Sequence, residues 1–245
     1  MVILVALLIA GSGFFQYLDQ PLPQGQMGPE AEALAQRLQG AAGVPAWAQT
    51  GAVRWIFAGH HHLWDRQRGW ARVRWEDFEV QLDVDRKVGL AWRKGALLPA
   101  AEAQKRIEQA WRLWINDSFW LNPVAKFFDP GTERRLVALP GGEEGLLISY
   151  RSGGATPGDS YLWLAGEDGL PRAWRMWVSI IPLGGLQASW EHWITLDTGA
   201  RVATRHRLWR FTLELQEVAG ARTLAELEPG PDPFAALAAY LVPAP

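Results

Sequence analysis

Hydrophobic and polar residues alternate with a period of two along most of the middle of the chain. This period places successive side chains on opposite faces of a strand and is typical of an antiparallel sheet. Between residues 52 and 92 the runs are short, and the turn-like segments RQRG and DRK that separate them leave no room for crossover helices. Strands are expected at residues 52–59, 62–65, 70–75, 78–84, 88–92, 146–151, 161–164, 172–180, 188–196 and 202–218.

Helical spacing of apolar residues appears in three segments. Residues 30–39 and 99–115 carry apolar side chains three and four positions apart; glycine follows the first segment and Pro99 opens the second. A third, short helix is expected at residues 233–241, after a Pro- and Gly-rich segment. Strands are expected to resume only beyond the Pro- and Gly-punctuated stretch 122–142.

Many short strands with few helices predict a mainly β (α+β) fold. A sheet of this size must close or be covered, so we expect a single large curved antiparallel sheet, or an incomplete β-barrel, with one or two helices on its concave face. The chain shows no internal repeat and no linker inside residues 45–220, which favours one domain. The expected parts are residues 1–18, a linker with a short helix at 19–44, the half-barrel at 45–228, and a Pro-rich segment with a short helix at 229–245.

The N-terminal segment is apolar and uncharged. Residues 2–15 read VILVALLIAGSGFF, a run shorter than the roughly 20 residues of a membrane-spanning helix but typical of the core of a signal peptide. We therefore expect residues 1–18 to be a signal peptide and the protein to be exported, to the periplasm or cell envelope. A buried N-terminal strand or helix, and an uncleaved membrane anchor reaching Leu18, remain alternatives.

Composition excludes several classes of function. The 245 residues carry a net charge of -2 and no cysteine, so disulfides, thiolate nucleophiles and Cys-ligated zinc are excluded. Without an excess of positive charge, nucleic acid is not an expected partner. The 15 tryptophans are the unusual feature of the composition.

A histidine cluster is the main candidate for metal chemistry. On a strand, His60 and His62 share a face, and with Asp65 they form a ligand set suited to zinc or non-haem iron. A metal site needs a third ligand in a fixed position, and nothing in the sequence shows that another ligand converges on this cluster. We therefore expect no metal and no cofactor. A metal-dependent enzyme that uses this cluster stays open as an alternative.

Other catalytic patterns are missing. The chain has no Gly-x-Ser-x-Gly elbow and no glycine-rich phosphate loop, so no catalytic residue is assigned and a non-enzymatic protein is expected. The segments DRQRGWARVRW and RHRLWRF interleave arginine with tryptophan, which predicts cation–π pairs on a solvated sheet face.

The segment WINDSFWLNPVAKFFDPG, residues 114–131, has unusual local chemistry. Asn116 and Asp117 are expected to follow the long helix and to satisfy the backbone groups freed at its end. Pro123 blocks continuation of the helix, and the Asp-Pro-Gly sequence beginning at Asp129 predicts a tight turn.

This segment, together with His-Leu-Trp-Asp at residues 62–65, resembles a group of uncharacterised bacterial exported proteins allied to the LolA/LolB-like lipoprotein-carrier superfamily. The matched motif residues include His62, Trp64, Asp65, Asn116, Asp117, Pro123, Lys126 and Asp129. The resemblance implies an incomplete antiparallel barrel with helices as a lid, whose characterised members hold acyl chains or other lipids in an apolar hollow. It implies no catalytic residues.

The leading hypothesis is therefore a monomeric carrier that binds a lipid or an acylated protein and associates with the membrane, if at all, through its N-terminal segment. The side chains expected to line its hollow are Trp55, Phe57, Trp75, Trp111, Trp114, Trp120, Trp177, Trp209 and Phe211. One alternative is a carbohydrate- or cell-envelope-binding module with exposed tryptophan platforms. The other is an enzyme, which requires His62, Asp65, Asn116 and Asp117 to converge in a pocket.

Overall fold

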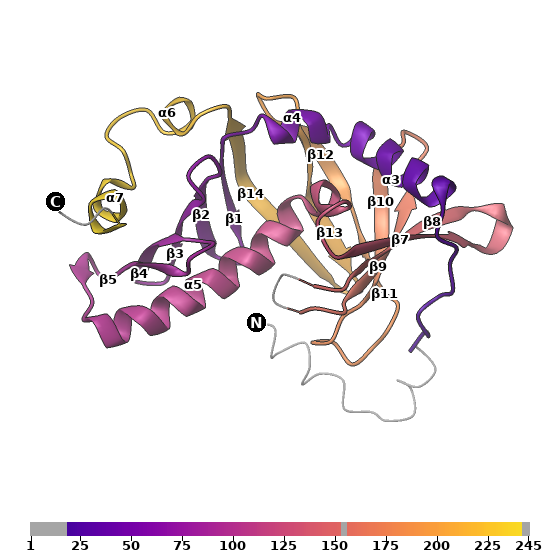
Figure 1. The fold of residues 1–245 in the computed structure, drawn as a ribbon, viewed down its shortest axis with the longest axis horizontal. Coiled ribbons are helices and arrows are strands. Elements are labelled where there is room, and N and C mark those ends of the chain that lie inside the picture. The colour runs from indigo at the N-terminus through magenta and orange to yellow at the C-terminus, as the bar shows by residue number, and fades with distance from the viewer. Residues whose placement is uncertain (1–18, 153–155, 242–245) are drawn as a thin grey trace. The chain divides into compact units, whose positions relative to one another are not determined.

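The computed structural model describes residues 19–152 and 156–241 (Figure 1). Fourteen strands form one antiparallel sheet in the order β6-β5-β4-β3-β2-β1-β14-β13-β11-β10-β9-β8-β7, with β12 paired to β13. The order ends at β6 and β7, so the described sheet is open. The prediction of a mainly β protein with one large antiparallel sheet and a few helices is confirmed.

The expected signal peptide or anchor at residues 1–18 lies outside the described residues. Within the described ranges, no helix combines the length and the apolar character needed to cross a membrane.

The chain divides into two compact units. Unit 1 comprises the residues up to Ala42, Val124–Glu191 and Arg205–Thr212; unit 2 comprises Gly43–Pro123, His192–Thr204 and the residues from Leu213 onward. The range 45–228, expected to form one domain, therefore contributes to both units. The 3-10 helix η1 (Pro123–Lys126) and the strands β12 (Glu191–Thr195), β13 (Arg201–Leu208) and β14 (Phe211–Ala221) contain residues of both.

Unit 2 is built on a meander of consecutive antiparallel strands. These are β1 (Ala52–Phe57), β2 (His60–Asp65), β3 (Trp70–Trp75), β4 (Phe78–Asp83) and β5 (Val88–Arg93), followed by the short β6 (Ala96–Leu97). All five long strands were expected from the alternation. In one cross-strand row, Trp55 pairs with His62 and His62 with Val73, so these side chains lie on the same face.

Helices lie on both faces of this meander. The long helix α5 (Ala100–Leu121) packs against β3, β4 and β5. The C-terminal helices α6 (Leu224–Leu227) and α7 (Ala235–Leu241) contact β1 and β5, and their apolar residues form a core cluster with Ala52 and Leu63. Both faces are thus partly buried, which explains why several strands carry apolar residues on each side.

Helix α5 is longer than the sequence indicated. The helix was expected to end at residue 115, but it continues to Leu121, where Asn122 and Pro123 end it. Asn116 and Asp117 therefore lie inside the helix, and the prediction that they follow it is wrong. Asp117 faces the sheet with Trp114 and Leu121, which precede and follow it by three and four residues.

Unit 1 contains helix α3 and the strands β7 to β11. Helix α3 (Pro29–Ala41) packs against β7 and β8 and confirms the helix expected at residues 30–39. The remaining elements are β7 (Thr132–Ala138), the 3-10 helix η2 (Pro140–Gly142), β8 (Glu144–Tyr150), β9 (Ser160–Ala165), β10 (Pro171–Trp177) and β11 (Leu186–Ser189). The core of unit 1 contains Trp163, Trp174 and Trp190 in mutual ring contact.

Turns without typical turn residues account for several differences from the predicted elements. The single strand expected at residues 202–218 is the pair β13 and β14, broken at Trp209, which adopts a φ of 53°. Trp209 and Arg210 carry no turn signal, so the alternation runs through the break unmarked. The strand expected at 188–196 is likewise divided into β11 and β12, and neither β7 nor the short helix α4 (Val44–Ala48) was expected.

Strands β4 and β5 approach each other closely at Gly89. A Cβ added at Gly89 on β5 would lie 2.1 Å from the carbonyl oxygen of Gln81 on β4. We expect Gly89→Ala to lower the free energy of unfolding by about 1–3 kcal/mol, because the two backbones must separate. In urea denaturation, Gly40→Ala in α3 is the control: no atom lies within 4 Å of its added Cβ, and we expect a gain of about 0.5–1 kcal/mol. Equal effects of the two substitutions would contradict the prediction.

Candidate functional site

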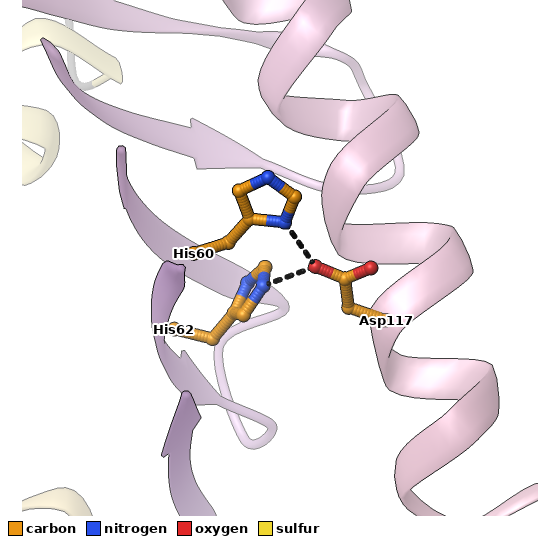
Figure 2. A group of neighbouring side chains, drawn as sticks. All are labelled: His60, His62 and Asp117. Carbon is orange, nitrogen blue, oxygen red and sulfur yellow. Dashed lines mark hydrogen bonds and ion pairs between the residues drawn. The ribbon is translucent and has the colours of Figure 1, made fainter. Parts of the chain in front are cut away.

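Two histidines of β2 and one aspartate of α5 converge in unit 2 (Figure 2). His60 Nδ1 and His62 Nε2 each lie 2.8 Å from the same oxygen, Oδ2 of Asp117. A carboxylate can only accept hydrogen bonds, so both imidazoles donate to it. The alternation of β2 places the two histidines on the same face of the strand, as expected, and α5 covers that face.

The cluster is buried, with one partly accessible member. The side chains of His62 and Asp117 are buried, whereas that of His60 is 23% exposed. The ring of His62 stacks on Trp55 with centroids 4.4 Å apart. On the far side of the carboxylate, Asn116 Nδ2 donates to Asp117 Oδ1 at 2.8 Å, which fixes the orientation of the carboxylate.

Burial and hydrogen bonding act on these groups in opposite directions. Burial lowers the pKa of His62 even though the hydrogen bond to Asp117 favours its charged form. Burial alone would raise the pKa of Asp117, but the hydrogen bonds from His60 and His62 outweigh it and hold that pKa below its usual range. Asp117 is therefore an ionised carboxylate that accepts hydrogen bonds from these two histidines and from Asn116.

Asp65, the carboxylate expected beside the histidines, points elsewhere. It follows His62 by three residues, so strand alternation turns it to the opposite face. There it accepts hydrogen bonds from the backbone N–H groups of Gln67 and Arg68 and pairs with the Arg68 guanidinium. The prediction of a His60, His62 and Asp65 cluster is wrong in its third member, which is Asp117.

A signal for Asp117 was present in the sequence. An acidic residue three positions after Trp114 and four before Leu121 falls on the apolar face of the helix, where an unpaired carboxylate is costly. The expected helix end at residue 115 hid this position. Of the four residues that the enzyme alternative required, the structure brings together His62, Asn116 and Asp117.

An aromatic layer surrounds the cluster between α5 and the strands of unit 2. Trp120 of α5 stacks on Phe57 with centroids 6.1 Å apart, and Trp114 meets Trp64 edge-on at 5.1 Å. The buried indole N–H groups of Trp55, Trp64 and Trp114 have no hydrogen-bond partner in the described structure. The two segments of the resemblance motif, on β2 and α5, thus meet in this layer.

The side chains expected to line a hollow are divided between the units. Trp55, Phe57, Trp75, Trp111, Trp114 and Trp120 belong to unit 2, and Trp177, Trp209 and Phe211 to unit 1. In unit 2, Trp75 packs beside Phe78, and Trp111 donates to the carbonyl of Val84.

The three unit 1 side chains have different surroundings. Trp177 packs beside a cluster of buried aliphatic residues and donates to the carbonyl of Gln20. Trp209 and Phe211 are 72% and 41% exposed. All 15 tryptophans lie in the described ranges, and Trp209 is the one that is exposed.

The remaining motif residues have local structural roles. Pro123 follows α5 and begins η1, while Lys126 and Asp129 form an ion pair of 3.4 Å in unit 1. The motif therefore runs across the point where the chain passes from one unit to the other.

Arginines occupy the face of the unit 2 strands opposite α5. A small pocket there is lined by Arg54, Arg72 and Arg74 together with Glu217 and Glu228. Nearby cations stack on aromatic rings: the guanidinium of Arg66 lies 4.4 Å from the Trp47 ring, and that of Arg68 lies 4.5 Å from the Trp70 ring. The expected cation–π pairs are confirmed.

The fold and the site define a mainly β protein with a buried His-Asp-His cluster set in an aromatic layer. No protein-family model matches the chain. No curated protein matches it in sequence either. Among solved structures it is similar to a DUF1329 family protein from Desulfovibrio piger, with 9% identity and a TM-score of 0.39, over 83% of this chain and 98% of that chain.

Proposed function

We propose that the protein is an exported, non-enzymatic carrier that holds a lipid or lipoprotein acyl chain between α5 and the strands of unit 2. The observation that carries the proposal is the buried aromatic layer, in which the indole N–H groups of Trp55, Trp64 and Trp114 have no hydrogen-bond partner. The sequence resemblance to lipoprotein carriers supports it, because the two segments of the motif form this layer.

Apolar and polar features of the layer suit the two ends of an amphipathic ligand. Aromatic faces shield hydrocarbon, and each buried methylene contributes about 0.8 kcal/mol before the ordering costs of binding are subtracted. A buried donor without an acceptor costs about 1–3 kcal/mol, so an ester or carboxyl oxygen that accepts from an indole N–H removes this penalty. A ligand that combines an acyl chain with such an oxygen satisfies both features.

The geometry favours this proposal over the carbohydrate-binding alternative. Sugars stack on flat tryptophan platforms that face solvent. Here every tryptophan except Trp209 is buried or partly buried. In unit 2, Trp114 and Trp120 instead face the sheet from α5.

Entry of a ligand into this layer requires α5 to separate from the strands. We expect that purification without detergent of the chain from residue 20 onward, followed by native mass spectrometry and organic extraction, will yield a co-purifying acyl lipid. An empty protein that also fails to bind a fluorescent fatty acid overturns the proposal.

A conservative substitution tests the role of the indole donor. Trp114→Phe keeps an aromatic ring but removes the N–H group together with the five-membered part of the indole, so we expect it to weaken fatty-acid binding at least fivefold, the value of one hydrogen bond of about 1 kcal/mol. Trp209→Phe, at the exposed turn of unit 1, is the matched control and is expected to bind like the unmodified chain. Equal binding by all three proteins would place the ligand elsewhere.

Export is the second part of the proposal and rests on the uncharged apolar sequence of residues 2–15. Fractionation of cells that express the full-length chain tests it. Recovery of the chain in the cytoplasmic fraction would overturn export.

A further inference from the structure

The His60, His62 and Asp117 side chains are arranged as metal ligands are. Their nearest donor atoms, Nδ1, Nε2 and a carboxylate oxygen, all lie within 4.8 Å of one another. We propose that these residues bind a divalent transition-metal ion such as Zn²⁺. The inference does not depend on the proposed lipid, because the ion contacts only these side chains and water.

The two separations between a histidine nitrogen and the Asp117 carboxylate need only a small change, whereas the two histidine nitrogens, which lie within 4.8 Å of each other, would also have to reach the ligand spacing of zinc. Zinc ligands at about 2.0–2.1 Å in a tetrahedron are separated from each other by about 3.3 Å. Each histidine nitrogen now lies 2.8 Å from Asp117 Oδ2, so each of these separations needs to widen by about half an ångström. The partly exposed His60 side chain is the member with room to move.

The donor set matches the chemistry of such an ion. Neutral imidazole and carboxylate are ligands that zinc and its neighbours in the transition series accept, whereas Mg²⁺ and Ca²⁺ prefer oxygen alone. Binding places the lone pairs of His60 Nδ1 and His62 Nε2 on the ion, so the proton of each neutral ring moves to its other nitrogen. No proton is gained or lost by the two rings in this exchange.

Neighbouring groups support the ligands. The amide of Asn116 holds Oδ1 of Asp117 and leaves Oδ2 facing the histidines, as outer hydrogen bonds do in metal sites. Buried charges are paired in proteins or bind metals, and the described salt-bridge contacts of Asp117 are to two imidazoles, with no lysine or arginine among them. A divalent ion supplies the full opposite charge.

The ion would join two elements of unit 2. Its ligands come from β2 and α5, which are separated by about 50 residues in the chain, so binding cross-links the helix to the strands. The partly exposed His60 leaves a route for ions, and a fourth position remains for water.

The test uses the full chain without an affinity tag, stripped with chelator and then titrated with Co²⁺ or Zn²⁺ alone. Native mass spectrometry should show one ion per chain, and bound Co²⁺ should give the visible absorption of a tetrahedral site. Asp117→Asn and His60→Gln should each lower the affinity at least tenfold, and Zn²⁺ should raise the Tm of the unmodified chain more than that of either variant. His61→Gln, which changes the exposed neighbour on the opposite face of β2, is the matched control and should bind like the unmodified chain.

Two results would overturn the proposal. The first is the absence of a stoichiometric ion in native mass spectrometry at micromolar Zn²⁺. The second is an affinity for Zn²⁺ that His60→Gln leaves unchanged. The His60 side chain is partly exposed, so we expect this variant to fold even if a variant at the buried Asp117 fails to fold. Neither result bears on the lipid extracted from the purified chain.

Discussion

Replacing Trp163 with alanine is expected to lower the free energy of unfolding of unit 1 by about 3–5 kcal/mol, the usual cost of removing a buried tryptophan. The Trp163 side chain is 1% exposed, and its ring lies 4.9 Å from Trp174, 5.2 Å from Trp190 and 5.2 Å from Phe127. The alanine leaves a cavity that three large rings cannot fill without moving. Because domains have net stabilities of only about 5–15 kcal/mol, this loss is a large fraction of the total.

Guanidinium denaturation followed by far-ultraviolet circular dichroism measures this effect. The matched control is Trp209→Ala in the same unit, where a 72% exposed ring loses few packed neighbours and the expected change is within about 0.5 kcal/mol. A loss at Trp163 no larger than the loss at Trp209 would show that the aromatic cluster does not form the core of unit 1.

The contrast between Trp163 and Trp209 also shows what the sequence can predict. Both residues lie in runs with strand periodicity, and the alternation correctly indicated strands around each. It did not distinguish a tryptophan in the core from one in a turn, because no glycine, proline, asparagine or aspartate marks the break after Leu208. Strand existence is a local property of the pattern, whereas the end of a strand depended here on tertiary packing.

The same distinction applies to the candidate site. The two-residue spacing of His60 and His62 predicted their common face, since strand alternation depends only on position. The partner carboxylate could not be found in this way, because Asp117 is more than 50 residues away and approaches through helix packing. Asp65 was chosen for its closeness in sequence, but a separation of three residues along a strand turns it to the other face.

The division into two units was the largest feature without a sequence signal. Linkers are recognised by composition, and of the five points where the chain changes unit only the one between Ala42 and Gly43 is flanked by glycines, Gly40 and Gly43. At Pro123 the change follows directly on the end of α5, and near residues 191–192 and 204–205 it falls within strands. A strand shared by two units keeps its alternation throughout, so a pattern search reads it as continuous.

Acidification is expected to destabilise the protein through His206. This side chain is buried beside Trp190, with ring centroids 4.3 Å apart, and its Nδ1 donates to the carbonyl of Ser189 at 3.1 Å. Burial lowers the pKa of His206 to about 4, although the Ser189 carbonyl and the Glu191 carboxylate both favour the charged form. In the unfolded chain the pKa returns to about 6.5.

The sign of the effect follows from these two values. Above about pH 6.5 His206 is neutral in both states and contributes no pH dependence. Between about pH 6.5 and 4 the unfolded chain binds a proton that the folded chain does not, so the free energy of unfolding falls as the pH falls. The expected loss from this residue is about 2–4 kcal/mol and is complete below about pH 4, where both states are protonated.

Urea denaturation at pH 7, 5.5 and 4.5, with the unmodified chain and His206→Gln compared at each pH, isolates this contribution. Carboxylates and the other histidines titrate in both proteins, so the difference between the two slopes belongs to His206. We expect the variant to lose less stability between pH 7 and 4.5, whereas His61→Gln, which changes an exposed histidine, should follow the unmodified chain. Parallel pH profiles for the unmodified chain and His206→Gln would mean that His206 accepts its proton without unfolding, which its burial against Trp190 should prevent.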